Sequence, residues 1–200
     1  DQIFVDGKRV SSRQGLDKGK HRYLLYNKNE NEICSKKDPR GRATVFDKLP
    51  PLKHGRWISV GRLDFNTTGL LLFTTDGDTA NLLTHPSSMI EREYAVRVMG
   101  NVEPSMIKSM HEGVRIDSDI YRFTDIQYFG GDGLNRWYHV VVMTGRNREV
   151  RKLWESQGVK VSRLKRVRFG PIFMPSKLKR GQHQELSQKE VEKLLKLVKS

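Results

Sequence analysis

The chain has 200 residues and a mass of 23.2 kDa, which is long enough for a sizeable hydrophobic core. Lys and Arg number 37 against 23 Asp and Glu, so the net charge is +14 and the pI is near 10.0. A polyanion is therefore the first partner to expect. We expect no membrane span and no secretory signal, and the single cysteine, Cys34, fits a reducing, cytoplasmic location.

Several chemistries have no support in the sequence. The six histidines are separated from one another by at least 26 residues, which disfavours a local zinc motif. The glycines at 15–20 and 130–133 do not match a phosphate-binding loop or a dinucleotide fingerprint. We therefore expect neither a metal nor a cofactor.

Strand patterns dominate the middle of the chain. Segments rich in β-branched, aromatic or alternating residues predict strands at 22–27, 57–60, 70–75, 94–99, 121–129, 137–144 and 161–169. Capping residues, prolines and glycines predict helices from a cap at Asp78 to 83, at 104–112, at 147–157 and after the capping box at 187–190. Because strands and helices do not alternate regularly, we expect an α+β fold with an extensive mixed, mainly antiparallel sheet flanked by a few helices.

Two segments are expected to lack regular structure. Residues 28–56 are rich in Asn, Lys, Asp, Pro and Gly, which predicts a long basic loop, and residues 6–20 are typical of a linker.

Half of the net positive charge lies in one short stretch. It carries two acidic residues, Glu149 and Glu155, and nine basic ones: Arg146, Arg148, Arg151, Lys152, Lys160, Arg163, Lys165, Arg166 and Arg168. A single Lys is more often only solvated, but a helix and a strand that share such a cluster favour a nucleic-acid surface. A second basic group, Lys36, Lys37, Arg40 and Arg42, indicates a wrapped or structured partner.

One carboxylate stands in a distinctive setting. Asp64 lies between Leu63 and Phe65, just before the apolar strand that follows Thr67-Thr68-Gly69. Loss of solvation there would raise its pKa unless cations or backbone amides favour the charged form. From the residues alone, the plainer interpretation is that the Asp64 side chain caps a turn.

The motifs resemble those of bacterial ribosomal RNA pseudouridine synthases. The matching segments span roughly 22–175 and keep the family's order: Gly61-Arg62-Leu63-Asp64 with Thr68-Gly69-Leu70-Leu71-Leu72, Leu83-Thr84-His85-Pro86, Glu93-Tyr94, 145–152 and 164–170. The segment 34–50 most resembles the branch that modifies large-subunit RNA. Two departures stand out: Asn27-Lys28-Asn29-Glu30 replaces the usual Asn-Lys-Pro, and only 3–10 resembles the last strand of the family's S4-like RNA-binding domain.

The resemblance implies a fold, a domain organisation and a reaction. The fold would have two sub-lobes around a central cleft, with residues 21–200 as the catalytic domain and 1–20 as a remnant of the S4-like domain and its linker. The reaction would isomerise a uridine of ribosomal RNA, most simply in 23S RNA, without a cofactor. The base would be flipped out of its stack, and the enzyme would act as a monomer.

The resemblance also implies roles for individual residues. Asp64 would be the catalytic carboxylate, Arg151 its ion-pair partner, and Tyr94 the ring that stacks on uracil. Arg62 would fill the space left by the flipped base, and Val150 and Leu164 would form an apolar floor. The remaining RNA contacts would come from Arg40, Arg42, Arg146, Arg148, Arg163, Lys165 and Arg166.

Three other functions remain open at this point. The chain could be a catalytically silent RNA-binding protein, a metal-dependent nuclease using Asp64, Asp76 and Asp78, or a glycosidase. A glycosidase would need two cooperating carboxylates, and the sequence singles out one.

Overall fold

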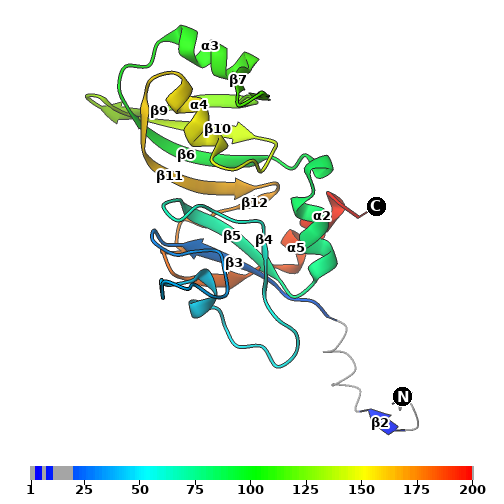
Figure 1. Ribbon diagram of the computed structural model, residues 1–200. Helices are drawn as coiled ribbons and strands as arrows, with labels where there is room; N and C mark the ends of the chain where they lie inside the picture. Colours follow the sequence, from blue (N-terminus) through cyan, green and yellow to red (C-terminus); the bar gives the residue numbers. More distant parts are fainter. Residues whose placement is uncertain (1–2, 6–7, 11–19, 200) are drawn as a thin grey trace.

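The computed structural model describes residues 3–5, 8–10 and 20–199, and its centre is a nine-stranded sheet (Figure 1). The order is β13-β3-β5-β11-β6-β10-β9, with β4 also on β5 and β12 also on β11. The strands are β3 (Tyr23–Lys28), β4 (Ile58–Val60), β5 (Thr68–Thr74), β6 (Arg92–Met99), β9 (Asp125–Asp132), β10 (Asn135–Val142), β11 (Lys160–Phe169), β12 (Ile172–Phe173) and β13 (His183–Glu185). Among the described strands, only β5 and β11 pair in parallel, so the expected mixed, mainly antiparallel sheet is confirmed.

A few helices flank the sheet, as expected. They are α2 (Gly77–Thr84), α3 (Pro104–Glu112), α4 (Glu149–Ser156) and α5 (Gln188–Lys196). The α5 capping box is present, with Ser187 Oγ accepting from the Glu190 amide at 3.2 Å. No helix in the described part of the chain is both long and apolar enough to cross a membrane.

Three local predictions need correction. Asp76, not Asp78, caps α2, because its side chain accepts from the Thr79 amide at 3.3 Å. The predicted strand 121–129 is divided into β8 (Asp119–Tyr121) and β9, and β8 pairs with β7 (Val114–Ile116) outside the main sheet. The helix predicted at 147–157 begins at Glu149, because Arg148 has the left-handed φ of 53°.

The sheet carries two lobes that meet at β11. In Figure 1 the lower lobe contains β3, β4 and β5 with α2 and α5, and the upper lobe contains β6, β9 and β10 with α3 and α4. The lower lobe has apolar clusters on both sides of β3 and β5, whereas the upper lobe has one cluster between the sheet and α3 and α4. Leu164 of β11 belongs to the upper cluster and Phe169 to a lower one, so β11 ties the lobes together.

Gly69 makes the β5–β11 junction possible. Its φ is +105°, and a Cβ there would lie 2.2 Å from the Arg166 carbonyl oxygen. Only glycine allows both this backbone conformation and this close approach of the two strands.

The segment predicted as a long loop is ordered against the lower lobe. It contains a short 3-10 helix, η1 (Val45–Lys48), and Val45 is fully buried beside Trp57 and Phe73. Near the start of the chain, β1 (Ile3–Val5) pairs with β2 (Lys8–Val10), so two strands stand where the resemblance indicated one. The predicted linker falls largely on 11–19, which lie outside the described residues.

Candidate active site

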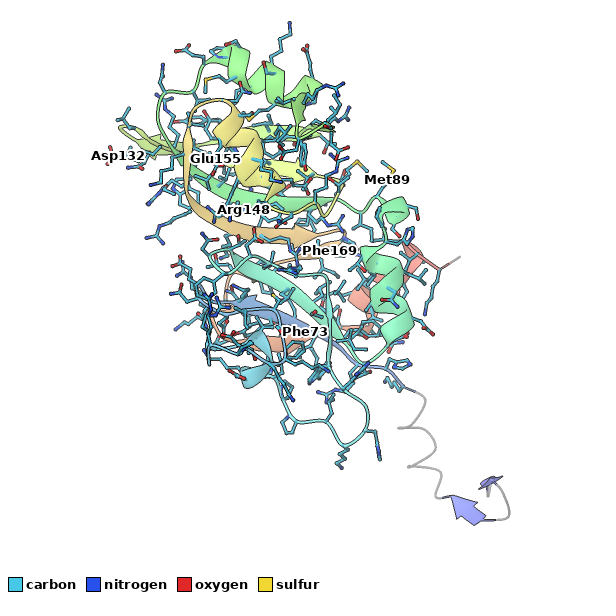
Figure 2. All side chains as sticks on the ribbon, in the orientation of Figure 1. Phe73, Met89, Asp132, Arg148, Glu155 and Phe169 are labelled. Carbon is cyan, nitrogen blue, oxygen red and sulfur yellow. The ribbon has the colours of Figure 1, made fainter. Side chains whose placement is uncertain are left out.

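A cavity of about 390 Å³ lies where the two lobes meet. Nine of the residues singled out from the sequence line it: Arg62, Asp64, Tyr94, Arg146, Arg148, Val150, Arg151, Leu164 and Arg166. They come from segments far apart in the sequence, which the junction at β11 brings together. Arg148 and Phe169, which also borders the cavity, are labelled in Figure 2 near the boundary between the lobes.

The cavity wall is strongly cationic. Six arginines line it, namely Arg62, Arg92, Arg146, Arg148, Arg151 and Arg166, against two carboxyls, Asp64 and Glu149. The net charge is +4 when all eight groups are ionised. Such a wall suits a ligand that carries phosphates.

Asp64 lies in the turn between β4 and β5, which we call the carboxylate loop (residues 61–67). Its backbone carbonyl accepts from the Thr67 amide at 3.0 Å and so closes the turn. No hydrogen bond to the Asp64 carboxylate is present among the described residues, and the side chain is only partly exposed at the cavity. The plainer interpretation, that the side chain caps the turn, is therefore wrong.

A buried lysine holds the carboxylate loop from below. Lys28, at the end of β3, is 0% exposed, and its Nζ donates to the carbonyls of Asn29 at 2.9 Å, Phe65 at 3.3 Å and Thr67 at 2.9 Å. Burial lowers the pKa of Lys28, while nearby acids that include Asp64 oppose this shift. Lys28 thus fixes the backbone on both sides of Asn66 and puts a cation near the carboxylate.

The opposite wall is formed by the start of α4 and by residues 145–148, which we call the arginine loop. Arg148 caps α4 in its left-handed conformation, and Arg146 Nη1 donates to the Ile120 carbonyl at 2.7 Å. The Arg146 guanidinium also lies 4.7 Å from the Tyr121 ring centroid.

The guanidinium of Arg151 binds the backbone of the carboxylate loop. Arg151 is 7% exposed, and its Nη2 donates to the Asn66 carbonyl at 3.4 Å. Burial lowers the pKa of Arg151, while Arg148 lowers it further and Asp64 opposes the shift, so the two charges attract each other across the cavity. No hydrogen bond or ion pair joins these two side chains in the described structure, because the guanidinium is engaged by the carboxylate loop's backbone instead.

Arg166 is a buried residue and not part of an exposed cationic strand. It is 3% exposed, and its Nε donates to the Leu70 carbonyl at 2.8 Å. Three buried polar atoms of cavity-lining residues have no hydrogen-bond partner among the residues that the structure describes: Arg166 Nη2, Arg151 Nε and Thr67 Oγ1. A buried polar group without a partner costs stability.

The rest of the wall offers apolar and aromatic surface. Val150 and Leu164 are buried in the upper cluster and also border the cavity. Tyr94 is half-buried and packs against both the upper cluster and a lower one. Arg62 is exposed at the cavity mouth.

Glu149 is a second carboxyl that the sequence interpretation did not assign. It is 7% exposed, and Thr144 Oγ1 donates to its Oε2 at 2.6 Å. Burial raises the pKa of Glu149 to about 7, although Thr144, Arg92 and Arg146 oppose the shift. Glu149, Lys28 and Arg92 were all missed, because nothing in the sequence marks a charged side chain as buried.

Four of the expected RNA contacts lie outside the cavity. Arg40 and Arg42 are exposed in the segment before η1, where Arg42 Nε pairs with Asp38 at 2.7 Å and its guanidinium lies 5.3 Å from the Phe65 ring centroid. Arg163 and Lys165 alternate along β11 with Leu164 and Arg166, so they face the other side of the sheet.

A wider cavity of about 990 Å³ lies in the lower lobe, between the start of β3 and α5, and contains none of the predicted site residues. The acids of the nuclease alternative are also dispersed. Asp76 caps α2 and Asp78 is exposed in its first turn, and neither lines the 390 Å³ cavity with Asp64.

Comparison with known proteins assigns the family. Residues 22–156 match the model of the RNA pseudouridylate synthase family. The chain is 56% identical over 193 residues to a protein of Pseudomonas aeruginosa named "Ribosomal large subunit pseudouridine synthase B", covering 96% of this chain. It is also 56% identical over 196 residues to the protein of that name from Vibrio cholerae, covering 98% of this chain. The chain belongs to the RNA pseudouridylate synthase family.

A solved structure agrees with this assignment. The structure titled "Crystal structure of pseudouridylate synthase" superposes with a TM-score of 0.77 at 28% identity, covering 88% of this chain and 74% of that one. The expected fold is thereby confirmed. The chain spans 50% of the length of the Pseudomonas relative and 61% of the Vibrio relative.

Proposed function

We propose that the chain isomerises a uridine to pseudouridine in ribosomal RNA, with Asp64 as the catalytic carboxylate. The observation that carries this proposal is a carboxylate without a hydrogen-bond partner among the described residues, in a cavity with six arginines. Family membership supports the reaction, and the names of the relatives support RNA of the large subunit as the substrate. Residues 21–200 would form the catalytic domain.

The reaction conserves all atoms. The bond from N1 of uracil to C1′ of ribose breaks, a bond from C5 to C1′ forms, C5 loses its proton and N1 gains one. The ionised Asp64 would serve as a nucleophile towards C1′ or C6, or assist formation of a glycal. Lys28 and Arg151 place positive charge near the Asp64 carboxylate.

The base must leave its stack to reach Asp64. Tyr94 would stack on the uracil above a floor of Val150 and Leu164, and Arg62 at the mouth would occupy the space left in the RNA; all four residues line the cavity. Arg146 and Arg148 would bind the phosphates on either side of the flipped nucleotide. We further propose that the enzyme acts as a monomer in the cytoplasm, where large-subunit RNA is its partner.

The test is the appearance of pseudouridine in large-subunit RNA. Ribosomal RNA is incubated with the chain or with Asp64→Asn, treated with carbodiimide, and read by primer extension. We expect a new stop with the unaltered chain and none with Asp64→Asn, a loss of at least about a thousandfold. Release of tritium from transcripts labelled at C5 of uridine provides the rate.

A matched acid variant serves as the control. Asp78→Asn removes an exposed carboxylate outside the cavity and should leave the stop intact. A stop that persists with Asp64→Asn would show that Asp64 is not the catalytic carboxylate. Strand scission that depends on magnesium would indicate a nuclease, release of free uracil would indicate a glycosidase, and binding without a stop would indicate a silent RNA-binding protein.

A further inference from the structure

The upper lobe leaves one face of its sheet without a helix among the described elements. Side chains alternate across a strand, so Val96, Tyr138 and Val140 pack beneath α3 and α4 while their neighbours point to the other side. Six side chains define this open face: Arg97 of β6, Phe129 of β9, Trp137 and His139 of β10, and Arg163 and Lys165 of β11. None of them belongs to an apolar cluster among the described residues.

The register places these side chains in two rows across the strands. Trp137 pairs with Arg97, which pairs with Arg163, and one step along His139 pairs with Ala95, which pairs with Lys165. Directly paired residues lie on the same face, so each row has an aromatic ring at the β10 end and a cation at the β11 end. With strands about 4.8 Å apart, each row is roughly 10 Å long.

At the aromatic end of the face Phe129 is exposed, and Trp137 and His139 are partly exposed. Phe129 is 61% exposed, and its ring stacks on His139 with centroids 4.0 Å apart and an interplanar angle of 24°. The Arg97 guanidinium lies 6.0 Å from the Trp137 ring centroid, and its Nε donates to Ser162 Oγ at 2.9 Å. These contacts hold the rings and the guanidinium in place without help from a ligand.

The charge of the face is positive. Its nearby acid Glu93 is engaged by Arg168 at 3.5 Å and by His139 at 3.4 Å, and Glu30 lies 4.0 Å from Arg163. Lys165 and Arg97 have no ion-pair partner within the described residues. Flat rings next to cations are the elements that bind single-stranded nucleic acid, whose bases stack and whose phosphates pair.

We propose that the open face binds a single-stranded segment of RNA, with bases on Phe129 and Trp137 and phosphates on Arg97, Arg163 and Lys165. The inference rests on the proposed action on RNA, and it adds a second contact surface on the side of the sheet away from the cavity. A double helix hides its base faces, so it could not use the rings. Because the open face and the cavity lie on opposite sides of the sheet, the segment bound on the open face is a different part of the RNA from the nucleotide in the cavity.

The test uses an RNA that cannot react. The whole chain is titrated against a fluorescent ten-nucleotide RNA of adenosine and cytidine only, and anisotropy gives the affinity. Phe129→Ala combined with Trp137→Ala should weaken binding by at least about tenfold, because two stacking contacts are lost. Phe129→Tyr combined with Trp137→Phe should restore binding, because both rings remain.

Tyr128→Ala is the matched control. Tyr128 neighbours Phe129 and is 58% exposed. The centroid of its ring lies 5.4 Å from that of Tyr138 in the upper cluster, so Tyr128 is on the other face of the sheet. Its removal should leave the affinity within twofold. Thermal melts of all variants show whether each one folds.

The cations are tested by salt dependence. Arg163→Gln combined with Lys165→Gln should reduce the slope of log affinity against log salt by about 1.4, as expected for two lost phosphate contacts on a single strand. An unchanged slope would show that Arg163 and Lys165 do not contact the RNA phosphates.

Two results would overturn the proposal. One is an equal affinity of the double Ala variant and the unaltered chain for the uridine-free RNA. The other is a dimer in sedimentation experiments that the double Ala variant abolishes, which would make the face a protein contact. Failure of the isomerisation is separate: uridine-free RNA would still bind through the face while labelled transcripts released no tritium.

Discussion

The carboxylate loop and the arginine loop face each other across the cavity, and they are held in different ways. The carboxylate loop is fixed through its backbone, by the turn at Thr67 and by Lys28, so the Asp64 side chain makes no bond to its own scaffold in the described structure. The arginine loop and the start of α4 are fixed through side chains: Arg146 donates to the Ile120 carbonyl, and Glu149 accepts from Thr144 Oγ1.

The difference separates two chemical tasks. In the proposed reaction Asp64 needs its carboxylate oxygens free, and in the described structure its neighbours position it rather than hydrogen bonds of its own side chain. Groups that bind phosphates need only remain charged and close, so the arginines can use some of their donors for anchoring.

The largest effect is expected at the junction that brings the two loops together. In Gly69→Ala the new Cβ would meet the Arg166 carbonyl oxygen at 2.2 Å, and the residue would also keep a φ of +105°. We expect a loss of about 4 kcal/mol or more in the free energy of unfolding, measured by urea denaturation.

Gly130→Ala separates the two causes of that loss. Gly130 has a φ of +91°, but no atom outside its chain neighbours lies within 4 Å of the position that a methyl group would take, so it tests backbone strain without a clash. We expect a loss of only about 1 kcal/mol there. Equal losses at both positions would show that the close approach of β5 and β11 does not limit stability.

The next effect concerns Glu149, the buried acid at the start of α4 that follows the arginine loop. Burial raises the pKa of Glu149 from 4.5 to about 7 in the folded chain, so between these values the folded state binds more protons than the unfolded state. The contribution of Glu149 to stability is therefore present below about pH 4.5 and is lost as pH rises towards 7. Compared with Glu149→Gln, the unaltered chain should lose up to about 3 kcal/mol across this window.

Urea denaturation at a series of pH values measures this difference. Glu155→Gln is the control, because Glu155 lies on the same helix and is exposed. The same pH slope in the unaltered chain and in Glu149→Gln would mean that Glu149 keeps an ordinary pKa.

A smaller effect is expected where the carboxylate loop is tied to β3. Lys28→Met keeps the approximate length of the side chain but removes the donors to the Phe65 and Thr67 carbonyls, while it also removes a costly buried charge. We expect a net loss of about 2 kcal/mol in stability, together with a lower rate of tritium release from a less ordered Asp64.

The exposed Lys53→Met is the control for Lys28→Met and should change neither quantity. If Lys28→Met reduces stability but leaves the rate of tritium release unchanged, the backbone ties do not position Asp64.

The sequence was most informative where a pattern is local. Alternating and capped segments predicted seven of the nine strands of the main sheet, four helices and the sheet class, but not the short β12 and β13. The motif around Asp64 predicted its place in a turn before β5. The β7–β8 hairpin, which separates β8 from β9, turns through left-handed conformations at Asp117 and Ser118, and α4 begins after the left-handed Arg148. Both features were missed, because Ser and Arg rarely adopt this conformation.

The sequence did not predict which charged side chains are buried. Arg163 and Arg166 are the same residue type in the same strand, but they face opposite sides of β11. A bulge between Val161 and Arg163 shifts the register of β11 against β6 and so helps to decide which side each one faces. Lysine is usually found at the surface, but Lys28 is buried because three backbone carbonyls accept hydrogen bonds from its Nζ. Such outcomes are set by tertiary contacts between distant segments.

The smallest effect is expected at the rim, where the carboxylate loop meets the segment before η1. Arg42 is bound to Asp38, and this hydrogen-bonded pair lowers the pKa of Asp38 to about 2, whereas the Arg40 side chain has no ion-pair partner in the described structure. An arginine already paired to a carboxylate offers less charge to a phosphate. Arg40→Gln should therefore weaken binding of ribosomal RNA by about threefold, and Arg42→Gln by less. Anisotropy titrations at two salt concentrations compare the pair, and a larger loss with Arg42→Gln would show that RNA displaces Asp38 and takes over its arginine.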